Sequence, residues 1–319
     1  MQERTFPEEY RVVCSREPIP ECEREELLCF VNRCNTQEKG NITRMTEEIL
    51  KRLEGRSIIL RLFRNRLVGF VAAIIIPLDG RKTTYTTYLC LDPEIRGAHL
   101  TPLLISRLIE EGGRIGIRTG YFLIPDSELW KSPTYPIRSW YRVLDVGLAR
   151  KLGFTLPFSG IPGSSRERLY YRVPTPNTSV RKVEEGDYAI VLSCLQIGGY
   201  QSPSPSSDEW SSFRSIFDLY LVFRDRDPIG LFGFFPLPVF LSRAQREVSM
   251  SMLSLVRGPV LSEALWIGQK EGFPVIYGNL LPPLTEEQVE KNRGLITNTT
   301  NYLGFFGKIT SEKFSLPMI

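Results

Sequence analysis

The chain has 319 residues, a length that suits one large domain or two of medium size. Hydrophobic residues make up 42% and charged residues 24%, so the composition is that of a folded globular protein and excludes a disordered chain. The net charge of +4 is mild, and the sequence has no dense Lys/Arg block with interleaved aromatics. We therefore expect an anionic ligand or an acidic surface as partner, and no nucleic acid.

The sequence lacks the marks of a membrane, secreted or metal-binding protein. The apolar run at 67–78 is too short to span a membrane, and MQERTFPEEY at the start lacks the core of a signal peptide. The six cysteines form no CxxC pair, and the one histidine, His99, is a poor basis for a zinc site or a Cys–His pair. We expect a monomer with free thiols in a reducing compartment, hence cytoplasmic, and with no metal.

Periodicity and turn residues predict alternating helices and strands along the chain. In the first half we expect helices at 23–34, 46–53 and 140–152 and strands at 57–63, 67–77, 83–91, 120–124 and 169–173. After a polar join at 175–179, we expect helices at 187–195, 208–217 and 259–271 and strands at 219–224, 229–235, 248–256 and 275–278. The tail at 301–319 would form short strands or coil.

The stretch 83–112 predicts a strand, a tight turn and a helix. Its strand ends at Asp92, because the following proline cannot donate to a ladder. Gly97 is free to take a positive φ in the turn. Thr101 would cap the next helix, with Pro102 at the first helical position.

This turn is a candidate phosphate site. A helix N-terminus offers unpaired N–H groups and a partial positive charge to an anion. Gly97 and Ala98 keep bulky side chains away, and Arg96 or His99 would add a donor. A bulge in the strand before the turn would expose amides able to hold a thioester carbonyl beside the pyrophosphate of coenzyme A. The alternative is an ordinary strand–turn–helix connection.

An internal repeat divides the chain. Residues 59–78, ILRLFRNRLVGFVAAIIIPL, resemble residues 220–239, YLVFRDRDPIGLFGFFPLPV. The strand, Arg-Gly turn and helix at 83–112 recur in the same order at 248–272. Two α+β halves of one topology would explain both landmarks.

Several segments resemble a known family. LCLDPEIRGAHL resembles the acyl-CoA-binding turn of the Gcn5-related acyltransferase fold, and the chain from Pro7 onward resembles a eukaryotic-type glycylpeptide N-myristoyltransferase. The segments that carry the resemblance, in the family's order and spacing, are RLVGFVAAI (66–74), YLCLDPEIRGAHLTPLLI (88–105), RSWYRVLD (138–145), LYYRVPTPNT (169–178), GFFPLP (233–238) and VLSEALWIGQKEGFPVIYGNLL (260–281).

The resemblance implies an α+β fold of two tandem Gcn5-related N-acyltransferase-like halves, related by a pseudo-two-fold, with a mixed central sheet flanked by helices. Residues 1–173 would form the acyl-CoA-binding half. Residues 174–319 would form the half that binds the peptide and carries the C-terminal carboxylate.

The same resemblance implies an enzyme that transfers myristate from myristoyl-CoA to the N-terminal glycine amine of client proteins, without a prosthetic group. The backbone amides of Tyr88 and Leu89 would form the oxyanion hole, and the α-carboxylate of Ile319 would be the general base. The residues expected around the acyl-CoA are Cys90, Leu91, Arg96, Gly97, Ala98, His99, Leu100 and Thr101. Those expected around the peptide are Thr87, Tyr141 and Phe235.

Some residues at these positions differ from the family's. Residues 97–99 are Gly-Ala-His where the family has Ser-Lys-Arg, and Thr87 stands in place of an Asn. Pro125 falls on an active-site Thr, Tyr141 on a peptide-pocket His and Phe235 on a Tyr. Two alternatives therefore stay open. One is a catalytically degraded acyl-CoA-binding or regulatory relative, and the other is an acyltransferase of the same fold with another acyl or amine substrate.

Overall fold

The computed structural model describes residues 6–34, 41–78, 80–124, 134–151, 154, 156, 160–198, 203–241, 246–281 and 283–306. The strands are β1 (Arg11–Ser15), β2 (Asn41–Thr43), β3 (Ser57–Arg64), β4 (Arg66–Leu78), β5 (Arg81–Leu91), β6 (Gly120–Ile124), β7 (Thr134–Val143), β8 (Ser179–Lys182), β9 (Asp218–Arg224), β10 (Asp227–Leu241), β11 (Arg246–Arg257), β12 (Val275–Asn279) and β13 (Leu295–Phe306). The helices are α1 (Glu21–Cys34), α2 (Glu47–Leu53), α3 (Leu100–Arg114), α4 (Val146–Lys151), α5 (Ser165–Tyr171), α6 (Tyr188–Leu195), α7 (Ser207–Ile216), α8 (Leu261–Lys270) and α9 (Glu286–Lys291), with 3-10 turns η1 (Pro93–Ile95) and η3 (Glu185–Asp187). Within these ranges no helix is long and apolar enough to cross a bilayer.

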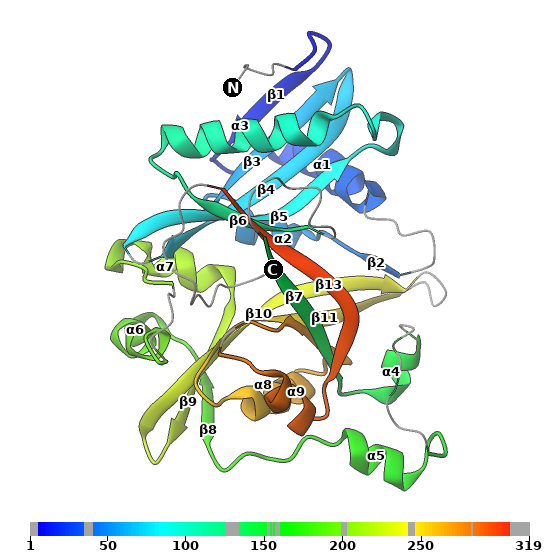
Figure 1. The fold of residues 1–319 in the computed structure, drawn as a ribbon, viewed down its shortest axis with the longest axis vertical. Coiled ribbons are helices and arrows are strands. Elements are labelled where there is room, and N and C mark those ends of the chain that lie inside the picture. Colours follow the sequence, from blue (N-terminus) through cyan, green and yellow to red (C-terminus); the bar gives the residue numbers. More distant parts are fainter. Residues whose placement is uncertain are drawn as a thin grey trace.

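The sheet has an internal two-fold order. Its strands run β1-β3-β4-β5-β6-β13-β7-β12-β11-β10-β9-β8, with β2 paired to β10 outside this path (Figure 1). On either side of the central β13–β7 pair, β3-β4-β5-β6 matches β9-β10-β11-β12 in reverse. The parallel pairs are β5·β6 and β11·β12, which occupy equivalent places. The predicted α+β fold, with two like halves and a mixed sheet, is confirmed.

The two halves exchange one strand each. Strand β7 lies early in the chain but pairs with β12, with Val143 opposite Val275. Strand β13 lies late in the chain but pairs with β6, with Phe305 opposite Tyr121. The exchanged strands also pair with each other, which joins the halves into one sheet. The division between residues 173 and 174 stays a prediction.

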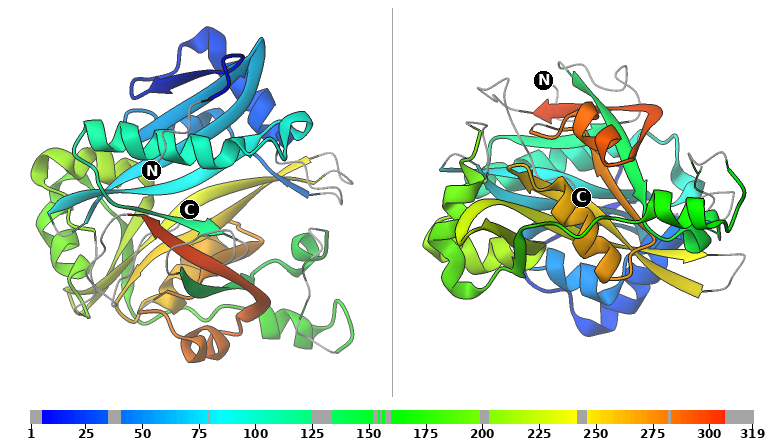
Figure 2. Two further views of the ribbon diagram at one scale, coloured as in Figure 1. Left: turned by 45° about the horizontal axis from the view of Figure 1, so that its top comes forward. Right: turned by 90° about the horizontal axis from the view of Figure 1, so that it is seen from below.

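Helices cover both faces of the first-half strands. On β4, Phe70 and Ala72 belong to the apolar cluster that includes α1, whereas Val71 and Ala73 belong to the cluster that includes α3. Figure 2 (left) shows α3 lying across these strands. Because both faces of β4 are buried, the strand is apolar along nearly its whole length instead of alternating with polar residues.

Two predicted elements were wrong. The helix expected at 140–152 is instead the end of β7 followed by the short α4. Trp140 packs directly against Gly278 of β12, where a Cβ would lie 3.0 Å from the indole, so strand pairing overrides the helical spacing. The strand expected at 169–173 is instead the end of α5, whose N-cap Ser164 accepts a backbone N–H through its side chain.

Candidate functional site

The strand that leads into the turn is bulged and then loses its neighbour. Ala72 and Ala73 of β4 oppose Tyr88 and Thr86, so Thr87 is an extra residue in β5. On its other side β5 pairs with β6 only over Thr84–Thr86. Beyond the bulge, the edge of β5 on the side of β6 takes part in no ladder with the described residues. This is the kind of bulge proposed above from the sequence, although no residue in it predicts its position.

The register decides which amide faces that open edge. The N–H of Asp92 donates to the carbonyl of Val68 at 2.9 Å, which makes these two residues a hydrogen-bonded pair. Antiparallel pairs alternate, so the N–H of Tyr88 is directed toward β4 and the N–H of Leu89 is directed away from it. Leu89 is 39% exposed, as expected for a residue at an open edge of the sheet.

The turn itself is open to solvent. Gly97 has a φ of +91°, and a Cβ there would meet no atom within 4 Å. His99 has a φ of +55° and is the N-cap of α3, without a side-chain capping bond. The predicted cap at Thr101 is therefore wrong, and Pro102 is the third helical residue. Pro102 still fits, because the first turn has no internal acceptor for its missing N–H. The N-terminus of this 15-residue helix keeps its backbone donors available.

Asp92 anchors the turn through two arginines of neighbouring elements. Its side chain is 4% exposed and lies 3.0 Å from Arg33 and 3.2 Å from Arg66. Its other oxygen accepts the backbone N–H of Glu94 at 3.1 Å, which caps η1. Sequence reasoning treated Asp92 only as the end of a strand. The signal it missed is an Asp before Pro, a common cap of a short helical turn.

Arg96 anchors the turn to α1. Its Nη2 donates to the carbonyl of Cys34 at 3.2 Å, and its Nε donates to the carbonyl of Leu91 at 3.3 Å. Cys34 is the last residue of α1, where carbonyls lack helical partners and a cation is favoured. The guanidinium of Arg96 is thus partly committed to the protein, which leaves the backbone as the main source of donors in the turn.

The cysteine at the end of β5 is not activated. Cys90 is 5% exposed, and burial, followed by the neighbouring Cys34, raises its pKa to about 12. Burial also raises the pKa of the Tyr88 phenol. Both side chains are neutral at physiological pH, so Cys90 is unsuited to act as a thiolate nucleophile.

The residues expected around a peptide do not all lie together. Phe235 on β10 is fully buried, in the apolar cluster that also contains Cys90. Tyr88 packs against the same cluster. Tyr141 on β7 belongs to a different cluster and lies 5.0 Å, between ring centroids, from Phe154. Thr87 is half-buried at the bulge. Pro125 and Ile319 lie outside the described residues.

Comparison with known proteins gives a fold but no sequence relative. No protein-family model and no curated protein matches the sequence. Three solved structures of Saccharomyces cerevisiae N-myristoyltransferase do match the fold. One with bound myristoyl-CoA has a TM-score of 0.77 at 14% identity, over 95% of this chain and 80% of that one. One with myristoyl-CoA and inhibitors has a TM-score of 0.77 at 13% identity, over 95% and 81%. A third, with bound myristoyl-CoA, has a TM-score of 0.76 at 14% identity, over 95% and 84%. The chain therefore has the fold of N-myristoyltransferase along nearly its whole length.

Proposed function

We propose that this protein is an acyltransferase of the N-myristoyltransferase type. It would transfer myristate from myristoyl-CoA to the N-terminal glycine amine of a client protein. One observation carries the proposal: a bulged strand with an open edge leads directly into a turn and an uncapped helix N-terminus. The fold shared with N-myristoyltransferase supports the same assignment.

The turn would bind the coenzyme A part of the donor. The first N–H groups of α3 at Leu100 and Thr101, with the adjoining turn Arg96–His99, would hold the pyrophosphate. Cys90 and Leu91 would line the path of the pantetheine along β5. The open space around Gly97 lets a phosphate approach the backbone closely.

The open edge of β5 would stabilise the reaction. The glycine amine attacks the thioester carbon, a C–N bond forms, the C–S bond breaks, and the thiol of coenzyme A leaves. The amide of Leu89, which is directed away from β4, would donate to the oxygen that becomes negative. The amide of Tyr88, the second donor expected from the family resemblance, is directed toward β4 instead. The α-carboxylate of Ile319 would take the proton of the amine. Of the residues expected around the peptide, the half-buried Thr87 and Tyr141 would be able to contact it, whereas Phe235 is fully buried.

Calorimetric titration tests the donor. Myristoyl-CoA should bind much more tightly than acetyl-CoA or free coenzyme A, because each buried CH₂ contributes about 0.8 kcal/mol. An Ala98→Asp variant should weaken all coenzyme A binding about tenfold by repulsion, while an acid at a helix N-terminus leaves the fold intact. Ser207→Asp places the same charge in the first turn of α7 and is the matched control. Equal affinities for all three compounds would overturn the acyl specificity.

Transfer to peptides tests the reaction. Radiolabelled myristoyl-CoA and Gly-starting peptides should give acylated product, and a single glycine added after Ile319 should slow transfer without weakening myristoyl-CoA binding. Binding without transfer to any amine would instead support an acyl-CoA-binding protein. Transfer to amines other than an N-terminal glycine would support the same fold with another acceptor.

A further inference from the structure

A cavity rich in positive charge lies in the half of the molecule opposite the turn before α3. It has a volume of about 710 Å³ and is lined by residues of β7, α8, the end of α9 and the segment that follows α5. Four of its lining residues are cations: Arg142, Arg172, Lys291 and Arg293. Among the described residues that line it there is no Asp or Glu. We call these four residues and the space between them the basic pocket.

Arg142 forms the deep end of the basic pocket. It is 2% exposed, and its Nη1 donates to the carbonyl of Val143 at 2.9 Å. Its Nη2 reaches the carbonyls of Tyr170 and Tyr171, each at 3.4 Å, while its Nε has no hydrogen-bond partner in the described part of the chain. Burial and the nearby charge of Arg293 lower the pKa of Arg142 to about 10, so it remains a cation at neutral pH.

Arg293 lies beside Arg142 on the same helix end. Its Nη1 donates to the carbonyls of Tyr170 at 2.5 Å and Leu169 at 3.4 Å, and its guanidinium lies 4.8 Å from the Tyr170 ring centre. Two arginines therefore share the C-terminus of the seven-residue α5. A helix C-terminus supplies at most about half a negative charge, which cannot balance two guanidinium groups.

The remaining cations add to this excess. Arg172 is exposed at the mouth of the pocket and makes no ion pair with a described carboxylate. Lys291 pairs with Glu287 at 2.7 Å, but this pair is solvent-exposed and contributes little. The pocket thus keeps at least three guanidinium charges without a carboxylate partner among the described residues. An unbalanced cluster of this kind favours a bound anion.

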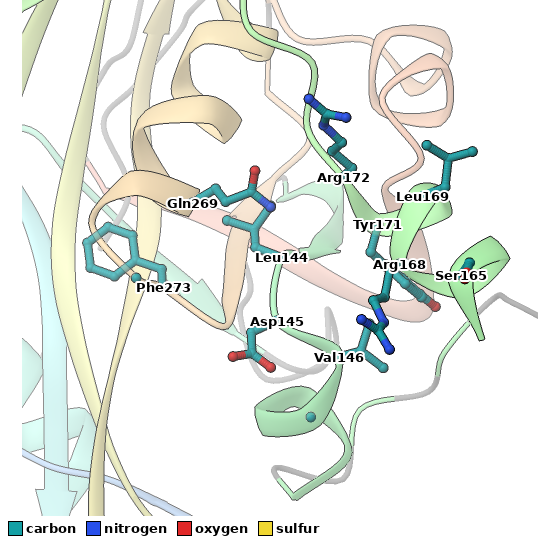
Figure 3. A pocket seen from close by; sticks show the side chains of 12 residues that line it. Leu144, Asp145, Val146, Ser165, Arg168, Leu169, Tyr171, Arg172, Gln269 and Phe273 are labelled. Carbon is teal, nitrogen blue, oxygen red and sulfur yellow. The ribbon is translucent and has the colours of Figure 1, made fainter. Parts of the chain in front are cut away.

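Part of the pocket wall is apolar, and the pocket opens toward a neighbouring cavity. Val173 and Leu265 are buried wall residues, at 6% and 1% exposure, and Leu169 at the rim is 65% exposed. Leu169 and Arg172 also line a neighbouring cavity of about 790 Å³, to which Arg168 adds a further cation. Figure 3 shows Arg168 and Arg172 on the α5 side of that cavity, opposite Gln269 and Phe273.

We propose that the basic pocket binds a small organic phosphate monoester. The phosphate would lie between Arg142, Arg172 and Arg293, and an apolar body would lie against Val173 and Leu265. Guanidinium groups match phosphate geometry by paired hydrogen bonds, and a dianion balances more of this charge than a carboxylate does. In Figure 1, α3 lies in the upper part of the molecule and α5, α8 and α9 in the lower part, so the basic pocket is separate from the proposed coenzyme A turn.

Titration of the full chain with phenyl phosphate tests this proposal, with benzoate and inorganic phosphate as comparison ligands. Phenyl phosphate should bind at least tenfold more tightly than benzoate and more tightly than inorganic phosphate. Its affinity should fall with salt, and fall again below about pH 6, where the monoester loses its second charge. Equal binding of phenyl phosphate and benzoate, or no binding of phenyl phosphate, would overturn the proposal.

Variants locate the binding. Arg172→Gln should weaken phenyl phosphate about tenfold with the fold unchanged, because Arg172 is exposed. Arg293→Gln should weaken it at least as much. Arg224→Gln removes another exposed arginine, outside the pocket, and should change nothing. Unchanged affinity in both pocket variants would refute the assignment. Weaker binding of phenyl phosphate by the Ala98→Asp variant would place it at the turn instead, whereas failure of acyl transfer leaves this result untouched.

Discussion

The two halves contain equivalent Arg-Gly turns, and one of them is open while the other is closely packed. In the first half, the strand bulges at Thr87 and continues to the open glycine Gly97. In the second half, Gly233 and Phe234 of β10 oppose Leu255 and Leu253, so β11 bulges at Ser254 before reaching Gly258. Gly258 also has a positive φ, +78°, but a Cβ there would lie 2.3 Å from the carbonyl oxygen of Ile229. One turn faces solvent and the other is closed by its own chain.

The difference has a cause in chain length. Ten positions separate Thr87 from Gly97 and four separate Ser254 from Gly258, so the first half has six more residues there. Those residues include η1 and the buried Asp92, which hold the turn away from the sheet. A repeated unit thus stays open to solvent in one copy and packs closely in the other, and the two copies differ by a short insertion.

Substituting the two turn glycines should give the largest contrast. Gly258→Ala combines a left-handed backbone with a clash against Ile229 and should destabilise the protein by about 4 kcal/mol. Gly97→Ala meets only the backbone strain, about 1 kcal/mol, because its surroundings are empty. Urea unfolding of both variants measures the difference. Equal losses of stability would show that the two turns are equally packed.

The arginine before each glycine should show the next largest contrast. Arg257 is fully buried and donates to the carbonyls of Leu195 at 3.2 Å and Val256 at 2.7 Å. Arg257→Ala should cost about 3 kcal/mol, because it leaves a cavity and buried carbonyls. Arg96→Ala removes bonds of 3.2 and 3.3 Å at an exposed residue and should cost less than about 1 kcal/mol. A thermal melt of each variant compares them, and the ranking is wrong if Arg96→Ala lowers Tm more.

Removing Asp92 should loosen the inserted segment that distinguishes the first turn from the second. Asp92→Ala deletes the acceptor shared by Arg33, Arg66 and the Glu94 amide. Both arginines are about half exposed, so the loss should be about 2 kcal/mol and less than for a fully buried pair. Limited proteolysis should then cut the segment 92–99 faster than in wild type. Unchanged cleavage there would mean that η1 is held by other contacts.

The residues three positions after the two bulges, Cys90 and Arg257, should affect the pH dependence of the unfolding free energy in opposite directions. These effects should be smaller than those of the substitutions above. Cys90 has its pKa raised from 9.0 to about 12, so above pH 9 only the unfolded chain loses this proton and stability falls. Arg257 has its pKa lowered to about 10 by burial, so above pH 10 its contribution to stability rises. Cys90→Ala should therefore flatten the fall of unfolding free energy from pH 9 to 10, by about 1 kcal/mol. An unaltered slope in urea titrations would contradict this.

Local patterns predicted the parts that form between neighbours in the chain. The hairpin at 57–77, the helix capped by Thr46 and the helix after the Arg-Gly turn follow from β-branched runs, caps and spacing. The exchange of β7 was not predictable, because the spacing around Trp140 also suits a helix and only pairing with β12 decides it. The bulge at Thr87 has no residue signature.

The candidate sites divide in the same way. The proposed coenzyme A turn is contiguous in the chain, so its residues could be named from the sequence together with the family resemblance. The basic pocket joins Arg142 to Arg293, which lie far apart in the chain. Arg142 belongs to the family-like segment 138–145, but nothing in that segment predicts Arg293 as its neighbour. Charge excess of this kind becomes visible only when folding brings the arginines to one helix end and the carboxylates elsewhere.

The exchanged strands set a condition on how the protein can be made. During synthesis the ribosome releases β6 long before β13, which is its neighbour in the finished sheet. Until residues 295–306 emerge, β6 keeps an unpaired edge, and β7 waits for β12 in the same way. The first half therefore cannot complete itself as an independent unit while it is being translated. A nascent chain stalled before β13 should expose this edge to chaperones, and release of β13 should close the sheet.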